Sequence, residues 1–225
     1  MAGTAPSVST SQDELNAILC EAVPRQGAWT DEEYLWLTDR SRRLIEFTDG
    51  YVQELPMTTS SHQAMLALLY RLFHAWLGPR GGVVLFSALR LRVREGKFRE
   101  PDLLVLRDSS DPRYQDRYWL GADLVVEVVS PDRPERDLVD KREDYAEAGI
   151  AEYWIVDPRD ELITVLALGP AGYVEDGAYA RGSVATSPLL DGFDIAVADV
   201  FDATGRALDG HPWELPVRTS EPRSC

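Results

Sequence analysis

Residues 123–131, Asp-Leu-Val-Val-Glu-Val-Val-Ser-Pro, contain an apolar run, Leu124 to Val129, that one acid, Glu127, interrupts. A run this rich in β-branched residues predicts a strand buried inside a sheet. A carboxylate inside such a strand is costly unless a cationic side chain, a metal ion or a proton compensates its charge. The stretch therefore indicates a site built around Glu127, and the flanking sequence supplies candidate partners.

A second acid precedes the neighbouring predicted strand. Pro101-Asp102 leads into the apolar run Leu103–Leu106, and a polar loop then connects this run to the one that contains Glu127. Consecutive strands joined by a loop usually pair antiparallel, so the start of one lies beside the end of the next. We therefore expect Asp102 and Glu127 to be neighbours. Two adjacent carboxylates repel unless a cation lies between them or they share a proton.

The segment that follows supplies a lysine. It predicts a helix that Asp137 caps and Gly149 ends. The apolar stripe of this helix consists of Leu138, Tyr145 and Ala148. Lys141 lies three residues after Leu138 and four before Tyr145, so it falls on the inward stripe. A buried lysine needs an anionic partner, and the two acids on the strands are the expected one.

The chain divides into one domain and two ends. Residues 1–27 are expected to form a partly disordered lead with one short helix across Gln12–Glu21. Residues 28–209 are expected to form a single domain, and residues 210–225 a loose, Pro-rich tail.

Several elements of the domain have clear local signals. Thr30 is expected to cap a short helix, and Asp49-Gly50 is typical of a two-residue hairpin turn. Further strands are expected at 152–157, 161–168 and 173–179.

A long helix is predicted from Ser60 or Ser61 to near Gly78, with His62 in its first turn. His62 falls on the apolar stripe, so it is either a structural residue or a site residue. Residues 83–94 predict one long strand.

Three arginines of that predicted strand, Arg90, Arg92 and Arg94, point away from its apolar face. They could follow the phosphate backbone of DNA, or they could form a solvated face that keeps a sheet edge from aggregating.

Composition limits the function. The formal net charge of −15 argues against a general nucleic-acid coat protein but fits a site that gathers carboxylates around a divalent cation. The two cysteines, Cys20 and Cys225, predict no disulfide framework and favour a reducing compartment. Neither a signal peptide nor a membrane-spanning run is recognisable, so the expected location is cytoplasmic.

Two carboxylates and an inward lysine fit metal-dependent phosphodiester hydrolysis. Asp102 and Glu127 would hold Mg²⁺, and Lys141 would act on the attacking water or on the charge at phosphorus. A buried ion network without catalysis fits the same spacing equally well. A metal-free glycosidase is a third interpretation, for which Trp119 and Trp154 are the available sugar platforms. The lysine has no role in that reaction.

The ordered combination of four motifs resembles a known family. These are Glu100-Pro-Asp102, then Leu124-Val-Val-Glu-Val-Val-Ser-Pro131, then Lys141 with Tyr145 and Gly149, then Tyr153-Trp-Ile-Val-Asp-Pro158. Together they resemble the bacterial family described as putative restriction endonucleases, within the PD-(D/E)XK nuclease superfamily. The resemblance covers roughly residues 28 to 200.

The resemblance implies a fold and an activity. The implied fold is α/β, a restriction-endonuclease-like core with a mixed β-sheet flanked by helices, to which the N-terminal helix and hairpin are added. The implied activity is DNA phosphodiester cleavage with Mg²⁺ or Mn²⁺. A homodimer suits cleavage of both strands of a duplex. The competing interpretation is a catalytically silent nuclease-fold protein that binds a protein or nucleic-acid partner.

The resemblance also assigns residues. Asp102 and Glu127 match the family's two acids, while Glu46 and His62 match an acid and a histidine that the family carries at these places. The superfamily pattern has its lysine two residues after the glutamate, where this chain has Val129. The family supplies the lysine from the next helix, at Lys141, which is the residue that the helical stripe selects.

Overall fold

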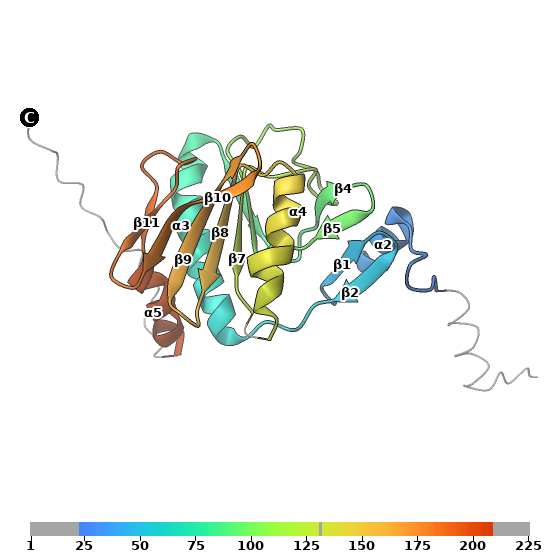
Figure 1. Cartoon of the computed structure of the whole chain (residues 1–225), viewed down its shortest axis with the longest axis horizontal. Coiled ribbons are helices and arrows are strands. Elements are labelled where there is room, and N and C mark those ends of the chain that lie inside the picture. The colour runs from blue at the N-terminus through green and yellow to red at the C-terminus, as the bar shows by residue number, and fades with distance from the viewer. Residues whose placement is uncertain (1–22, 131, 209–225) are drawn as a thin grey trace, which may run out of the picture.

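A six-stranded mixed sheet forms the centre of the computed structural model, which describes residues 23–130 and 132–208 (Figure 1). The strand order is β10-β9-β8-β7-β6-β3. β7 and β8 pair in parallel, and the other neighbours in this sheet pair antiparallel. The strands are β3 (Val83–Phe86), β6 (Leu103–Leu106), β7 (Leu124–Val128), β8 (Glu152–Asp157), β9 (Leu162–Gly169) and β10 (Gly172–Ala180).

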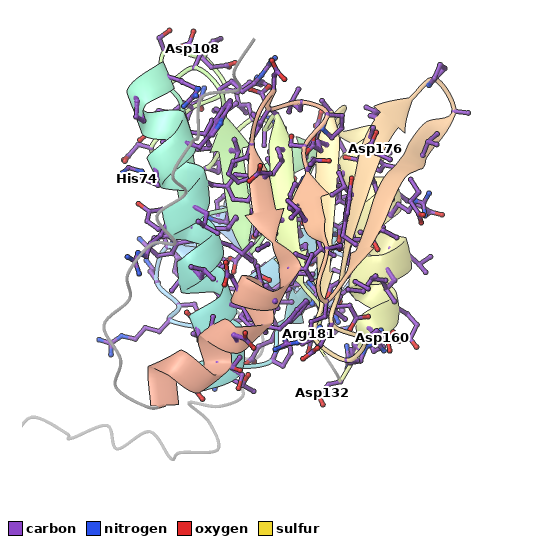
Figure 2. The ribbon with its side chains drawn as sticks, turned by 90° about the vertical axis from the view of Figure 1, so that its left-hand side faces the viewer. His74, Asp108, Asp132, Asp160, Asp176 and Arg181 are labelled. Atoms are coloured by element: carbon purple, nitrogen blue, oxygen red, sulfur yellow. The ribbon has the colours of Figure 1, made fainter. Side chains whose placement is uncertain are left out.

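Helices cover both faces of this sheet. α3 (Ser60–Leu77) and α5 (Val197–Leu208) pack on one face and α4 (Lys141–Glu147) on the other, as Figures 1 and 2 show. Successive strand residues point to opposite faces, so the run around Glu127 contributes side chains to two hydrophobic cores. Val126 and Val128 belong to the core on the α3 side, whereas Val125 and Val129 belong to the core with Tyr145 of α4.

A smaller sheet carries the N-terminal part of the domain. Its order is β2-β1-β5-β4, and its strands are β1 (Ile45–Thr48), β2 (Tyr51–Glu54), β4 (Leu91–Arg94) and β5 (Lys97–Arg99). Helix α2 (Asp31–Thr38) packs on it through Tyr34, whose ring lies 5.2 Å from that of Phe47 and 5.1 Å from that of Phe98. The remaining elements are η1 (Gly78–Arg80), η2 (Arg136–Asp140), β11 (Val184–Thr186) and β12 (Asp194–Ala196).

The predicted N-terminal caps and turns are largely confirmed. Thr30 caps α2 in a capping box with Glu33, and Asp49-Gly50 forms the turn between β1 and β2. The predicted cap of α3 was wrong by one residue. Thr59 is extended and accepts a hydrogen bond from the His62 backbone N–H, whereas Ser60 is already helical.

The single strand predicted over residues 83–94 is wrong. It is two strands in two sheets, because β3 pairs with β6 while β4 pairs with β5. The alternation of polar and apolar residues continues through both halves, so it does not show that they have different partners.

The start of the helix that carries Lys141 also differs from the prediction. Asp137 does not cap it but lies, buried, in the π-helical turn η2. A π turn contains one residue more than an α turn, so it shifts the inward stripe. Leu138 is therefore exposed, and the buried positions are Asp137, Lys141, Asp144 and Tyr145.

Some predictions fall outside the described residues. These are the helix across Gln12–Glu21, the tail of residues 210–225, most of the lead and both cysteines. Among the helices in residues 23–130 and 132–208, none has the length and hydrophobicity needed to cross a membrane.

The β1–β2 turn provides a test of the hairpin. Gly50 has φ +88°, and a Cβ there would lie 2.7 Å from backbone atoms of Gly27. Gly192 has φ +80° with nothing within 4 Å of its Cβ position. We expect Gly50→Ala to lower the free energy of unfolding by about 2 kcal/mol or more, and Gly192→Ala by about 1 kcal/mol. Urea denaturation followed by tryptophan fluorescence measures both. Equal losses would show that the Gly27 segment moves aside.

Candidate active site

The antiparallel pairing of β6 and β7 brings the two predicted acids together. Leu103 pairs with Val126, so the next position in this register sets Asp102 beside Glu127. The Val128 N–H donates a hydrogen bond of 2.8 Å to Asp102 Oδ2, which fixes the carboxylate at the end of β7. Both side chains are buried, with Glu127 2% and Asp102 8% exposed. The expected neighbourhood of the two acids is therefore present.

Glu127 is bound by two residues of the helix that covers it. Lys141 Nζ lies 2.7 Å from Glu127 Oε1, and the Tyr145 hydroxyl donates a short hydrogen bond to the same oxygen. Lys141 Nζ also lies 3.0 Å from Asp137 Oδ1, one turn earlier. Both of these contacts of Glu127 are made by the same oxygen, Oε1.

Burial disfavours the charged form of both Glu127 and Lys141, and the neighbouring charges then modify each pKa. Burial raises the pKa of Glu127, the Lys141 ammonium opposes this, and the carboxylates of Asp102 and Asp137 add to the rise. Burial lowers the pKa of Lys141, but the surrounding carboxylates, with Glu127 first, raise it by more. Lys141 therefore remains an ammonium at neutral pH and supplies the positive charge that the buried acids require.

His62 reaches the acids from the opposite side of the sheet. It stands in the first turn of α3, and its Nε2 lies 3.1 Å from Asp102 Oδ1. The imidazole is only 13% exposed. A continuous series of contacts thus joins four residues. His62 contacts Asp102, the Val128 N–H holds Asp102 beside Glu127, and Glu127 contacts Lys141.

Glu46 lies next to this set without touching the two acids. Its carboxylate is ion-paired with Arg136 and with Arg99, whose Nε is 3.5 Å away, and it accepts a hydrogen bond of 3.3 Å from the Glu100 N–H. Glu46 also contributes to the raised pKa of Lys141. Its position indicates that it holds Arg136 beside the site.

The acids open into a hollow of about 260 Å³, named here the carboxylate hollow. Its polar side holds the acids, His62 and Lys141, and its apolar side holds Leu55, Met57 and Met65. Asp132, which also lines it, is labelled in Figure 2 at one end of the sheet, and Asp108 lies at the opposite end. The hollow is therefore at the end of the sheet where β7 finishes and β6 begins.

Four further residues belong to the site but were not selected from the sequence: Glu100, Arg136, Asp137 and Tyr145. Glu100 is 5% exposed, and its Oε2 accepts no hydrogen bond within the described part of the chain. Burial and the nearby Glu46 raise the pKa of Glu100 to about 7. Asp137 could have been found from its spacing of four residues before Lys141, which is ion-pair spacing on a helix.

The donor atoms fit a hard divalent cation. Within residues 23–130 and 132–208 no group of three or more His, Cys, Asp or Glu side chains could hold a metal ion by itself. Mg²⁺ is usually bound by one or two carboxylates, with waters and substrate phosphates completing its six ligands. Two neighbouring carboxylates at an open hollow, Asp102 and Glu127, match that requirement.

The predicted arginine strip, Arg90, Arg92 and Arg94, alternates with buried residues as expected but is neutralised by acids. Arg90 pairs with Asp39 at 2.8 Å, and Arg92 pairs with Asp31 at 3.3 Å. Arg94 pairs with Asp49 at 2.7 Å and with Glu147 at 2.8 Å.

The structure does not support the glycosidase interpretation. Trp119 and Trp154, the two proposed sugar platforms, are both 0% exposed, so neither can stack on a sugar.

Comparison with known proteins identifies a family. A family model named Uma2 and described as "Putative restriction endonuclease" matches residues 31–198. The chain belongs to the Uma2 family. Comparison with curated proteins finds no match.

A solved structure resembles this Uma2 chain. It is a putative nuclease belonging to DUF820 from Anabaena variabilis ATCC 29413, with 18% sequence identity and a TM-score of 0.67. The match covers 78% of the Uma2 chain and 99% of the other chain. At this identity the likeness establishes the fold. The predicted restriction-endonuclease-like α/β core is therefore confirmed, and the family description supports a nuclease.

Proposed function

We propose that this Uma2 protein is a Mg²⁺-dependent endonuclease, with Mn²⁺ as a substitute, that hydrolyses phosphodiester bonds of DNA. The observation that carries the proposal is the Lys141 ammonium held 2.7 Å from Glu127, next to Asp102, at the wall of an open hollow. The family description supports the reaction class.

Asp102 and Glu127 would hold the cation. When bound, the ion polarises the phosphodiester and lowers the pKa of a bound water. Lys141 would orient that water or stabilise the negative charge that develops on the phosphate oxygens. Asp137 and Tyr145 position Lys141 and Glu127 for this task, and His62 fixes Asp102. Glu46 would act one step away, through Arg136.

A silent nuclease-fold module remains the second candidate, because Lys141 already forms ion pairs with Glu127 and Asp137 without any metal. Such a module would bind a protein or nucleic-acid partner and would not need the cation.

Cleavage separates the two candidates. Purified protein is incubated with supercoiled plasmid and with circular single-stranded DNA, in Mg²⁺, in Mn²⁺ and in EDTA. We expect metal-dependent strand breaks with the wild type and none with Asp102→Asn. A wild type that cuts neither substrate in either metal would favour the silent module.

Substitution of His62 tests its positioning role. His62→Ala is expected to lower the rate about 10- to 100-fold and to raise the Mg²⁺ concentration needed for half the maximal rate, as losses of ligand-orienting partners do. His74 provides a matched control, because it is an exposed histidine on the same helix (Figure 2). His74→Ala should leave both quantities unchanged. A normal Mg²⁺ requirement in His62→Ala would show that His62 does not position the metal ligand.

A further inference from the structure

A second hollow, of about 250 Å³, lies beside the carboxylate hollow and is named here the hairpin hollow. The two hollows share three lining residues, Arg133, Arg136 and Lys141. Lys141 of the proposed reaction centre therefore lines both recesses, whereas Asp102 and Glu127 line only the carboxylate hollow. A substrate that reaches the centre can extend in two directions from it.

The wall of the hairpin hollow is one face of the β1–β2 hairpin. Glu46 pairs with Gln53 and Thr48 pairs with Tyr51, and residues paired across an antiparallel ladder share a face. This face runs from the buried Glu46 outward to the amide of Gln53 and the ring of Tyr51, which is 59% exposed. The hydroxyl end of Tyr51 rests against Gly27. The ring is thus an exposed aromatic surface next to a charged centre.

The carboxylate hollow offers an apolar surface of its own. Leu55, Met57 and Met65 line it, and Met57 is 87% exposed. Exposed methionine is adaptable and packs well against flat aromatic groups. Each hollow is slightly smaller than a pocket for a drug-sized molecule, which starts at about 300 Å³. Each therefore has room for about one flat ring system, not for a double helix.

The charges around the hollows also disfavour a duplex. Duplex binding depends on many Lys and Arg side chains that replace counterions at successive phosphates. The chain has a net charge of −15, and its arginine strip is paired with acids. At the junction of the hollows, Arg133 is exposed, and no described residue pairs with its side chain. Arg133 therefore supplies an exposed positive charge where the two hollows meet.

We propose that this site takes single-stranded DNA, with one base stacked on Tyr51 in the hairpin hollow and the next against Met57 in the carboxylate hollow. Arg133 binds the phosphate between them. Aromatic stacking with a short stretch of positive charge is how proteins bind single strands, whose bases are unpaired and accessible. The assignment rests on the proposed function, since it places the scissile phosphate beside Asp102 and Glu127.

Binding tests the assignment without requiring cleavage. A fluorescently labelled, mixed-sequence DNA oligonucleotide is titrated with the full chain in EDTA and in Ca²⁺, alone and annealed to its complement. Fluorescence anisotropy should show at least tenfold tighter binding of the single strand. Tyr51→Ala should weaken it about tenfold and Tyr51→Phe should not, because the ring supplies the stacking surface. Arg133→Ala should weaken it and reduce its salt dependence.

A variant at another exposed aromatic residue tests whether the loss of binding is specific to Tyr51. Trp36 is 56% exposed on α2 and lines neither hollow, so Trp36→Ala should bind like the wild type. Three results would each overturn the assignment. They are equal affinity for duplex and single strand, no binding to either, and a Tyr51→Ala variant whose affinity equals that of the wild type. Single-strand binding without any cleavage would keep this assignment and remove the proposed enzyme. Cleavage of duplex plasmid without single-strand preference would do the reverse.

Discussion

Lys141→Met is expected to reduce DNA cleavage by about a hundredfold or more, the loss typical of removing a group that stabilises developing charge. Methionine keeps most of the length and packing of the lysine side chain but lacks its ammonium. The two carboxylates within 3.0 Å of Nζ, Glu127 and Asp137, would then lack their cation. We expect a loss of about 3 to 5 kcal/mol in the free energy of unfolding, because one partner of a buried ion network is gone.

Lys97→Met provides the control that separates catalysis from stability. Lys97 is also ion-paired with two acids, Asp144 and Glu147, each at 2.8 Å, and it lines neither hollow. Its loss should destabilise the protein less, because Glu147 is 42% exposed, and should leave the cleavage rate per folded molecule unchanged. Urea denaturation gives the folded fraction, and cleavage of supercoiled plasmid and of circular single-stranded DNA gives the rate. Full activity in folded Lys141→Met would refute the assignment of Lys141.

Mg²⁺ is expected to raise the melting temperature of the wild type by about 5 to 10 °C at saturating concentration, because a ligand of the folded state stabilises it by mass action. Glu127→Gln should abolish this shift. The amide removes the negative charge that, with Asp102, attracts the cation. Differential scanning fluorimetry with increasing Mg²⁺ measures the effect.

A buried glutamate in the adjacent strand serves as the control for Glu127→Gln. Glu152 on β8 is 1% exposed, and it accepts hydrogen bonds from Trp154, Ser187 and Leu189 away from both hollows. Glu152→Gln should lower stability yet keep the Mg²⁺ shift. An undiminished shift in Glu127→Gln would place the ion elsewhere.

The placement of the two acids could be predicted because it depends on strand order alone. Asp102 begins one strand and Glu127 nearly ends the next, and antiparallel pairing then makes them neighbours. The inward position of Lys141 was also predicted correctly, although for an incomplete reason. The π turn η2 replaces Leu138 with Asp137 on the inward stripe, and a heptad-like count does not reveal such a turn.

Contacts of the smaller sheet with the crossover segment could not be predicted. Arg136 of η2 contacts Glu46 of β1, and no local pattern encodes that approach. The break between β3 and β4 was hidden for a similar reason, since both halves have the alternation of a single strand. The short strands β11 and β12, three residues each, carry too little periodicity to be recognised.

The parallel pairing of β7 with β8 has a consequence for inheritance. Parallel neighbours require a crossover, and here η2 and α4 form it, so Glu127, Asp137, Lys141 and Tyr145 all lie within residues 124–157. Recombination between relatives that exchanged this one segment would transfer the central carboxylate together with its lysine and the side chains that orient it. The recipient would need to match the site residues that approach from outside the segment, namely Glu46, His62, Glu100 and Asp102. A single recombination event over residues 124–157 is therefore sufficient to transfer the central carboxylate and its lysine together.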